Sequence, residues 1–259
     1  MRIILDYTKT VPQNAAIFFD KAKKAKHKLE GVSTAIADSD AKLKALEANA
    51  LKGVSVARVK RQVEWFEKFH WMYTSGGLLA IGGRDASTNE VVVKKHMEPT
   101  DLVFHTEMSG SPFFLLKCGA KQPTQQDIEQ VGAMTAAYSK GWQKGFAGIA
   151  VFYIKPEQVS KEANTGEFMS KGSFMIRGER TYLHPDMELY LGKNERGMCI
   201  AGAKENVTLQ SIKSPIRIIQ GGGKPTDVAK KIAGLLEFHN LDEVVRMLPA
   251  GNVAMSKTI

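Results

Sequence analysis

Cysteine is scarce in this chain of 259 residues, which contains only Cys118 and Cys199, neither of them in a C-x-x-C pair. A disulfide framework or a structural zinc site needs more cysteines at closer spacing, so both are excluded. Two isolated thiols are instead typical of the reducing cytoplasm. No window approaches 18 consecutive apolar residues, and Met1–Tyr7 lacks the cleavage site of a secretory signal. We therefore expect a cytoplasmic protein with no membrane segment, metal or cofactor.

Acidic residues are also under-represented. The chain has 36 Lys and Arg but only 27 Asp and Glu, so its formal net charge is 36 − 27 = +9. Such an excess favours polyanionic partners and fast, salt-sensitive association with them. A solvated basic surface without any partner would give the same composition. The hydrophobic share of 43% and the charged share of 24% are those of a globular protein with a sizeable core.

The first part of the chain favours helix. Residues Asn14–Glu30 contain neither Pro nor Gly, Gly31 marks a stop, and Thr34–Leu51 resumes the helical pattern. A third helix is expected over Ser55–Phe69, after Gly53. The second helix has an apolar seam at spacings of seven, three and four residues, formed by Ile36, Leu43, Leu46 and Ala50. Residues 1–64 are therefore predicted to form a helical hairpin, a short antiparallel coiled coil, which could also join two copies into a homodimer.

Five lysines crowd the first of these helices, at Lys21, Lys23, Lys24, Lys26 and Lys28. They cover more than one helix face, so nearby acids cannot pair with all of them. The pattern fits either a solvated helix surface or a strip that faces phosphates.

Short strands replace helix from Trp71 onward. Leu78–Ile81 and Val91–Val93 flank a polar segment and predict a β-hairpin. Leu102–His105 and Phe113–Cys118 predict a second strand pair. Further strands are expected at Ile149–Ile154, Ser173–Ile176, Thr181–His184, Glu188–Leu191 and Met198–Ala203.

One helix interrupts these strands and begins at Thr124, because Asp127 three residues later completes a capping box. Strands still outnumber helices over residues 65–204. This region is therefore predicted to be an α+β domain with a mostly antiparallel sheet and packed helices.

The last region, residues 205–259, contains one predicted strand and two predicted helices. The strand Pro215–Ile219 leads into a turn at Gly221–Gly223, and helices follow over Thr226–Glu237 and Leu241–Leu248. Because about fifty residues make a weak independent core, we expect this extension to pack on the middle domain.

Catalytic motifs are incomplete. The triple glycine is followed by Lys224 and Pro225, whereas a Walker A loop needs Ser or Thr after the Lys. His105 and Glu107 match the H-x-E fragment of zinc deaminases, but the P-C-x-x-C that must follow is missing. Cys118 lies in an apolar strand and is expected to be buried, although a Cys–His pair that meets only in space stays open. We expect no catalytic residue.

Nucleic-acid binding needs cations, small polar groups and aromatic rings near a surface. Three segments supply them: Gly82–Asn89, His105–Pro112 and Gly172–Arg180. Each could equally be a plain turn whose glycines supply φ > 0 and whose Arg pairs with a carboxylate. Their joint occurrence in a basic chain favours binding.

Several longer motifs occur in a fixed order along the middle region. They are Trp71–Gly77, Ile81–Ala86, Asn89–Glu90, Asp101–Glu107, Ser109–Pro112, Val159–Lys161, Gly166–Phe168 and Gly172–Gly178. This ordered set resembles the NFACT-R domain of the NFACT family, which includes ribosome-associated quality-control factors and relatives of fibronectin-binding protein A. Leu5–Asp6, Asn14–Ala16 and the lysine-rich helix resemble the coiled-coil segment that precedes NFACT-R.

The resemblance implies an RNA-binding module that serves tRNA or ribosomal RNA, with the large ribosomal subunit as an expected partner. The residues expected to contact RNA by charge, hydrogen bonding or stacking are Arg84, Lys94, Lys95, His105, Ser109, Ser111, Trp142, Lys161, Lys171, Ser173, Phe174, Arg177 and Arg180. Full-length members begin with an NFACT-N domain and a helix-hairpin-helix element, for which the residues before 65 leave no room. The resemblance is therefore to a short member, and it implies no C-terminal tailing activity.

Two alternatives remain open from the sequence. In the first, the protein is an enzyme acting on a nucleotide or tRNA, with His105, Glu107 and Asp85 converging in a pocket. In the second, it is a protein-interaction module that dimerises through its helices. The sequence also leaves DNA open beside RNA.

Overall fold

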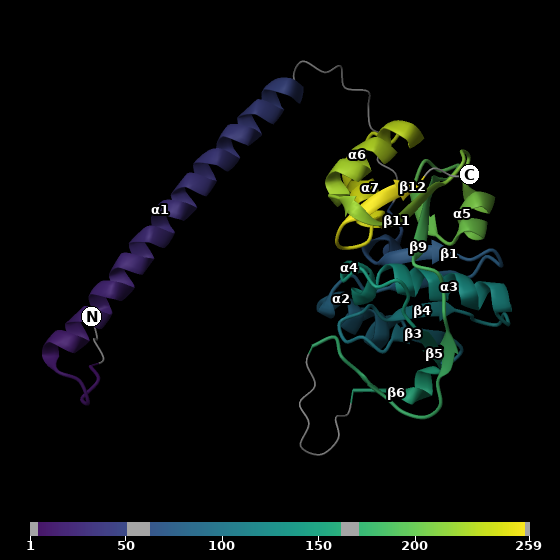
Figure 1. The fold of residues 1–259 in the computed structure, drawn as a ribbon, viewed down its shortest axis with the longest axis horizontal. Helices are drawn as coiled ribbons and strands as arrows, with labels where there is room; N and C mark the ends of the chain where they lie inside the picture. Colours follow the sequence, from purple (N-terminus) through teal and green to yellow (C-terminus); the bar gives the residue numbers. More distant parts are fainter. Residues whose placement is uncertain (1–4, 51–62, 162–170, 257–259) are drawn as a thin grey trace. The chain divides into compact units, whose positions relative to one another are not determined.

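The computed structural model describes residues 5–50, 63–161 and 171–256, with only the backbone for 43–50 (Figure 1). The chain divides into two compact units, residues 1–62 and 63–259. None of the helices in these ranges is long and apolar enough to cross a membrane.

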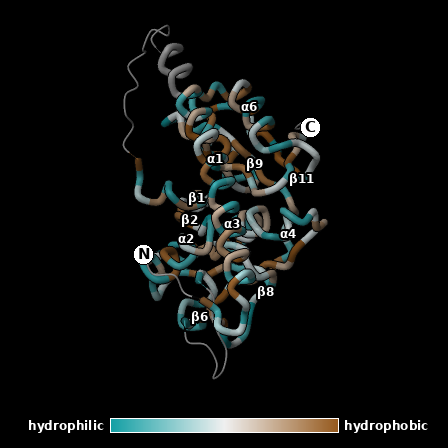
Figure 2. Tube along the Cα trace, turned by 90° about the vertical axis from the view of Figure 1, so that its left-hand side faces the viewer, coloured by the Kyte–Doolittle hydropathy of each residue, from teal (hydrophilic) through white to brown (hydrophobic). Residues whose placement is uncertain are grey.

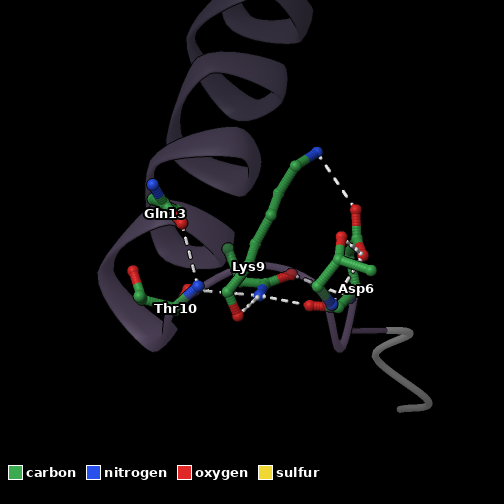
Figure 3. Close-up of polar contacts among 6 residues, drawn as sticks. Asp6, Lys9, Thr10 and Gln13 are labelled. Atoms are coloured by element: carbon green, nitrogen blue, oxygen red, sulfur yellow. Dashed lines mark hydrogen bonds and ion pairs between the residues drawn. The ribbon is translucent and has the colours of Figure 1, made fainter.

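The first unit is one long helix, α1 (Val11–Ala50), preceded by a short hook. Pro12 lies in the first turn, where its missing N–H costs nothing. In the hook, the backbone N–H of Thr10 donates to Gln13 Oε1 at 2.9 Å, and Lys9 pairs with Asp6 at 3.1 Å (Figure 3). The amide of Asn14 is buried and fastens the hook by donating to the carbonyl of Asp6 at 2.9 Å.

The predicted break at Gly31 is wrong, because α1 runs through it without interruption. A glycine inside a helix costs about 1 kcal/mol relative to alanine, and the helix-favouring residues on both sides outweigh that cost. The predicted hairpin therefore has no turn within 11–50. The restart after Gly53 and most of the helix over Ser55–Phe69 lie outside the described residues; the described end of that segment is a 3₁₀ turn, η1 (Trp65–Lys68).

The second unit contains a six-stranded antiparallel sheet in the order β1-β2-β4-β3-β5-β8. Its strands are β1 (His70–Tyr73), β2 (Leu79–Gly82), β3 (Leu102–Thr106), β4 (Phe114–Lys117), β5 (Val151–Ile154) and β8 (Thr181–Leu183). The predicted pairing of the strands at 102–105 and 113–118 is confirmed in β3 and β4.

A second antiparallel sheet has the order β10-β9-β11-β12. Its strands are β9 (Glu188–Lys193), β10 (Cys199–Gly202), β11 (Ile216–Gly223) and β12 (Val253–Ser256). The strands of residues 205–259 thus share a sheet with β9 and β10, while the boundary predicted at residue 204 stays a prediction. A small third sheet pairs β6 (Val159–Ser160) with β7 (Met175–Ile176).

Helix α3 (Gln125–Ala137) lies between the two larger sheets, packing on β3, β4 and β5 of one and on β9 and β10 of the other (Figure 1). Its capping box is confirmed, since Thr124 Oγ1 accepts from Asp127 N–H at 3.2 Å. The other helices are α2 (Ala86–Val91), the π-helix η2 (Val92–His96), α4 (Lys140–Gln143), η3 (Pro156–Gln158), α5 (Lys204–Gln210), α6 (Pro225–Leu236) and α7 (Leu241–Met247).

The core follows this layering. Hydrophobic stretches in Figure 2 run along strands such as β9 and β11, and hydrophilic stretches mark many of the connections. The largest fully buried side chains include Trp71, Phe104, Phe114 and Trp142. The α+β class with mostly antiparallel sheets and packed helices is therefore confirmed.

Two local predictions need correction. Val91–Val93 is not a strand but the junction of α2 and η2, because Asp85 caps a helix there and both Val92 and Val93 are buried by it. Gly221–Gly223 is not a turn but the end of β11, which bulges between Gln220 and Gly223 where both pair with Val253.

Candidate nucleic-acid interface

A cavity of about 990 Å³ in the second unit is lined by parts of all three segments that sequence analysis selects: Gly82–Asn89, His105–Pro112 and Gly172–Arg180. Other lining residues come from the junction of α3 and α4 and from the end of α7 with the residues after it. Four more are His70, Phe152, Lys171 and Pro225. The fold thus gathers segments that are far apart in the sequence around one opening.

Arg84 fixes one wall of the cavity. Its Nη2 donates to the carbonyl of Phe69 and its Nη1 to the carbonyl of Arg246, both at 2.8 Å. Burial lowers the pKa of this guanidinium from its usual value. Because two carbonyls already bind the guanidinium, Arg84 mainly links the residue before β1 and the loop before α2 to α7, and it is less available to a phosphate.

The turn from Thr106 to Ser111 forms a second wall. Thr106 Oγ1 donates to Ser111 Oγ at 2.7 Å, and His105 Nε2 lies 3.1 Å from the carbonyl of Ser111. The imidazole is buried and stacks on Phe113 with ring centroids 4.1 Å apart. Burial lowers the pKa of His105 and so favours its neutral imidazole. Ser109 is exposed at the tip of the turn.

Glu90 holds the third wall in place. Its carboxylate pairs with Lys94 at 2.7 Å, accepts from Gly172 N–H at 3.0 Å and lies 3.3 Å from Lys161 Nζ. These partners, Lys94 first, lower the pKa of Glu90 to about 2. Gly172 has φ +78°, and a Cβ there would lie 2.5 Å from the carbonyl oxygen of Ala86, so only glycine allows this close approach.

Arg180 and Glu107 face the cavity as a pair. Arg180 Nη1 donates to Glu107 Oε1 at 2.6 Å, and the hydroxyl of Tyr182 donates to the same oxygen at 2.6 Å. The hydrogen bond from Tyr182, followed by that from Arg180, lowers the pKa of Glu107. The guanidinium also lies 4.8 Å from the centroid of the Phe152 ring.

The enzymatic alternative gains no support from this geometry, although His105, Glu107 and Asp85 all line the cavity. Asp85 caps α2 by accepting from Thr88 N–H at 2.8 Å, and the other two have the partners given above. No hydrogen bond joins any two of the three within the described part of the chain.

Positive charge exceeds negative charge around the opening. Among the described residues, five cations line the cavity against two carboxylates, and these cations are Arg84, Lys140, Lys171, Arg180 and Arg246. Both carboxylates are already engaged, Asp85 as a helix cap and Glu107 with Arg180. Lys140, Lys171 and Arg246 are exposed and provide the positive charge of the rim. Cys118 and Cys199 are buried away from it, and burial raises the pKa of both thiols.

Comparison with known proteins identifies the segment that builds these walls. Residues 68–178 match the family model described as NFACT protein RNA binding domain. The chain belongs to the NFACT family. The NFACT-R match supplies the walls around Arg84, His105 and Gly172, whereas Arg180 and the lining residues of α7 lie beyond it.

Relatives of known name agree with this assignment. The archaeal Rqc2 homolog aRqcH of Methanocaldococcus jannaschii is 31% identical over 205 residues, which is 77% of this chain and 30% of that protein. Human ribosome quality control complex subunit NEMF is 34% identical over 181 residues, 66% of this chain and 16% of NEMF. Its Drosophila melanogaster homolog is 39% identical over 137 residues, 51% of this chain and 13% of the relative. The chain thus matches at most about a third of the length of these relatives.

Eight of the thirteen residues predicted to contact nucleic acid line the cavity of the NFACT-R unit. They are Arg84, His105, Ser109, Ser111, Lys171, Ser173, Phe174 and Arg180. Lys161 lies beside it, donating to the carbonyl of Ser173 at 3.0 Å. Lys94, Lys95 and Arg177 are exposed but do not belong to the lining.

The prediction that Trp142 contacts RNA is wrong. Its side chain is only 2% exposed and belongs to the core, so it offers no face on which a base could stack. The fold buries it because the short helix α4 packs against α3.

Several lining residues escape prediction from the sequence. Lys140 follows the end of α3 and could have been found from the positive charge after a helix C-terminus. Arg246, Tyr138 and Phe152 carry no local signal, because only tertiary packing brings them to the cavity.

Proposed function

We propose that the second unit is an RNA-binding module of ribosome-associated quality control, with tRNA or ribosomal RNA as its ligand. The observation that carries this proposal is the convergence of the three glycine-flanked polar segments on one cavity with a cationic rim. The NFACT-R match and the names of the relatives support the class of ligand. If the protein binds the large ribosomal subunit, it acts in the cytoplasm.

The charge arrangement suits phosphate better than a protein carboxylate. Lys140, Lys171 and Arg246 come from three separate segments of the chain and can follow a strand of phosphates across the opening. Such contacts release counterions, so the affinity should fall steeply with salt. A solvated basic surface without a partner would show no specific loss when these three residues alone are changed.

The test is the affinity of the full chain for a fluorescent tRNA at two salt concentrations. Changing Lys140, Lys171 and Arg246 to Gln should weaken binding and lower the salt slope by about 2–3, since each of the three phosphate contacts contributes about 0.7–0.9. The matched control changes the exposed Lys121, Lys204 and Lys231 to Gln, outside the cavity. RNA and DNA of the same sequence are compared in parallel. Equal losses in the two triple variants, or binding without a salt slope, would contradict the proposal.

We also propose that two copies of the chain pair through α1. Apolar residues follow a heptad spacing of four and three along this helix, at Phe18, Ala22, Ala25, Leu29, Val32 and Ile36. Leu29, Val32 and Ile36 are 68%, 56% and 57% exposed. A sustained stripe of this period is the seam of a coiled coil, and a second α1 has the matching seam.

A further inference from the structure

Aromatic rings form the floor of the cavity beneath its cationic rim. Phe113, Phe152 and Tyr138 are buried, and Phe174 is half-buried. Phe174 meets Phe113 edge to face with centroids 5.4 Å apart. Lys161 Nζ lies 4.7 Å from the centroid of the Phe174 ring and so occupies one of its faces. Because Phe174 lines the cavity and is only half-buried, part of its ring is left for a ligand to contact.

The combination of floor and rim selects a particular ligand chemistry. A phosphate alone would use the rim and leave the half-buried ring of Phe174 without a ligand. An apolar molecule alone would use the floor and leave Lys140, Lys171 and Arg246 unpaired. A nucleotide has both a flat base for the floor and a phosphate for the rim.

We propose that this cavity takes up a single unpaired nucleotide of an RNA strand, with its base on Phe174 and its phosphates on Lys140 and Lys171. This inference rests on the proposed RNA binding and specifies the part of the RNA that enters. The volume of about 990 Å³ is at the upper end of the range for pockets that hold small molecules. A base inside a duplex is stacked on both sides and cannot reach the floor, so ends, bulges and loops are preferred.

The experiment compares two RNA duplexes with equal numbers of phosphates, one blunt and one with a short single-stranded 3′ overhang. The full chain should bind the overhang RNA about tenfold more tightly, the range expected for stacking one base on an aromatic ring. Phe174→Leu keeps the apolar volume against Phe113 but removes the ring, so the affinity for the overhang RNA should fall to that for the blunt duplex. Phe174→Trp should keep the preference. Phe146→Leu is the matched control, because Phe146 is 43% exposed and lies outside the lining.

The outcomes separate the two proposals. If wild type binds both duplexes equally, or if Phe174→Leu retains the preference, the nucleotide site is overturned while RNA binding by phosphate contacts stands. If neither duplex binds with a salt dependence, the RNA-binding function itself fails. An unchanged thermal unfolding midpoint of Phe174→Leu ensures that loss of the preference reports on the missing ring.

Discussion

Arg84 joins three parts of the second unit that are distant along the chain. Its fork of N–H groups reaches the carbonyls of Phe69 and Arg246 at the same time, at 2.8 Å each. A lysine keeps the charge but has a single nitrogen and cannot span two acceptors in this fixed geometry.

Arg84→Lys should therefore lower the free energy of unfolding by about 1–2 kcal/mol, since one hydrogen bond from a charged donor to a buried carbonyl is lost. The urea midpoint of the full chain measures this. Arg177→Lys, at an exposed position, is the control and should leave the midpoint unchanged. If Arg84→Lys has the same urea midpoint as wild type, the two hydrogen bonds from the Arg84 guanidinium do not contribute to stability.

Asp101 is a second residue on which stability depends. Its side chain is 0% exposed, and Lys117 Nζ lies 2.6 Å from its Oδ2 while also donating to the carbonyl of His96 at 2.6 Å. Lys117→Met would leave a buried carboxylate without its cation, which typically costs about 3 kcal/mol or more.

Thermal or urea unfolding of Lys117→Met measures that cost, with Lys121→Met as an exposed control that should be nearly neutral. Adding Asp101→Asn to Lys117→Met should recover part of the loss, because the unpaired charge is then removed. If the two lysine variants lose equal stability, the buried pair is not a major support of the fold.

At the residue scale, side-chain chemistry predicts well which residues come to the cavity but less well what each one does there. Eight predicted residues line it, yet Arg84 is held by backbone carbonyls and Arg180 by Glu107. The bond from Arg84 to Arg246 and the bond from Arg180 to Glu107 each join residues more than seventy positions apart in the sequence. Spacing along the sequence does not reveal such distant partners. The sequence could therefore predict that these residues line the cavity, but not that their charges are already paired or hydrogen-bonded.

Among the elements, α2 and the segment 171–174 depend on one carboxylate. Glu90 joins them through Gly172 N–H and Lys161. Its folded pKa of about 2 lies below the usual 4.5. A depressed folded pKa stabilises the fold fully above pH 4.5, and this contribution is lost as the pH falls from 4.5 towards 2.

Wild type should thus lose more stability between pH 6 and pH 3 than Glu90→Gln, which has no carboxylate to protonate. Urea midpoints at the two pH values measure the difference. Glu129→Gln, an exposed change on α3, controls for the general effect of one carboxylate less. An equal acid loss in wild type and Glu90→Gln would mean that Glu90 does not hold this wall.

Helix α3 and the segment 91–93 show which elements can be predicted from sequence. The start of α3 follows from a local capping box, and its bonds are within three residues of each other. The three valines favour a strand by propensity, but the cap at Asp85 and the burial of Val92 and Val93 place them in helix. Strand propensity depends on which face is buried, and this is decided by tertiary contacts.

At the scale of the whole molecule, the heptad stripe of α1 raises the question of what covers it. The described side chains from residue 5 to 42 are almost all exposed, including Leu29, Val32 and Ile36. A helix of 40 residues is about 60 Å long, and such a stripe gains stability only by packing on another surface. A coiled coil of two α1 helices would bury it.

The full chain should therefore sediment with twice the mass of one chain at high concentration and dissociate on dilution. Leu29→Asp with Val32→Asp places charges in the seam and should hold the protein at the mass of one chain. Thr34→Asp with Ala41→Asp adds the same charge on the opposite face of α1 and should leave the pairing intact.

Because pairing would also link two RNA-binding units, the seam variant should lose affinity for a long RNA that occupies both units but keep its affinity for a short one. A seam variant that sediments like wild type would exclude α1 as the interface.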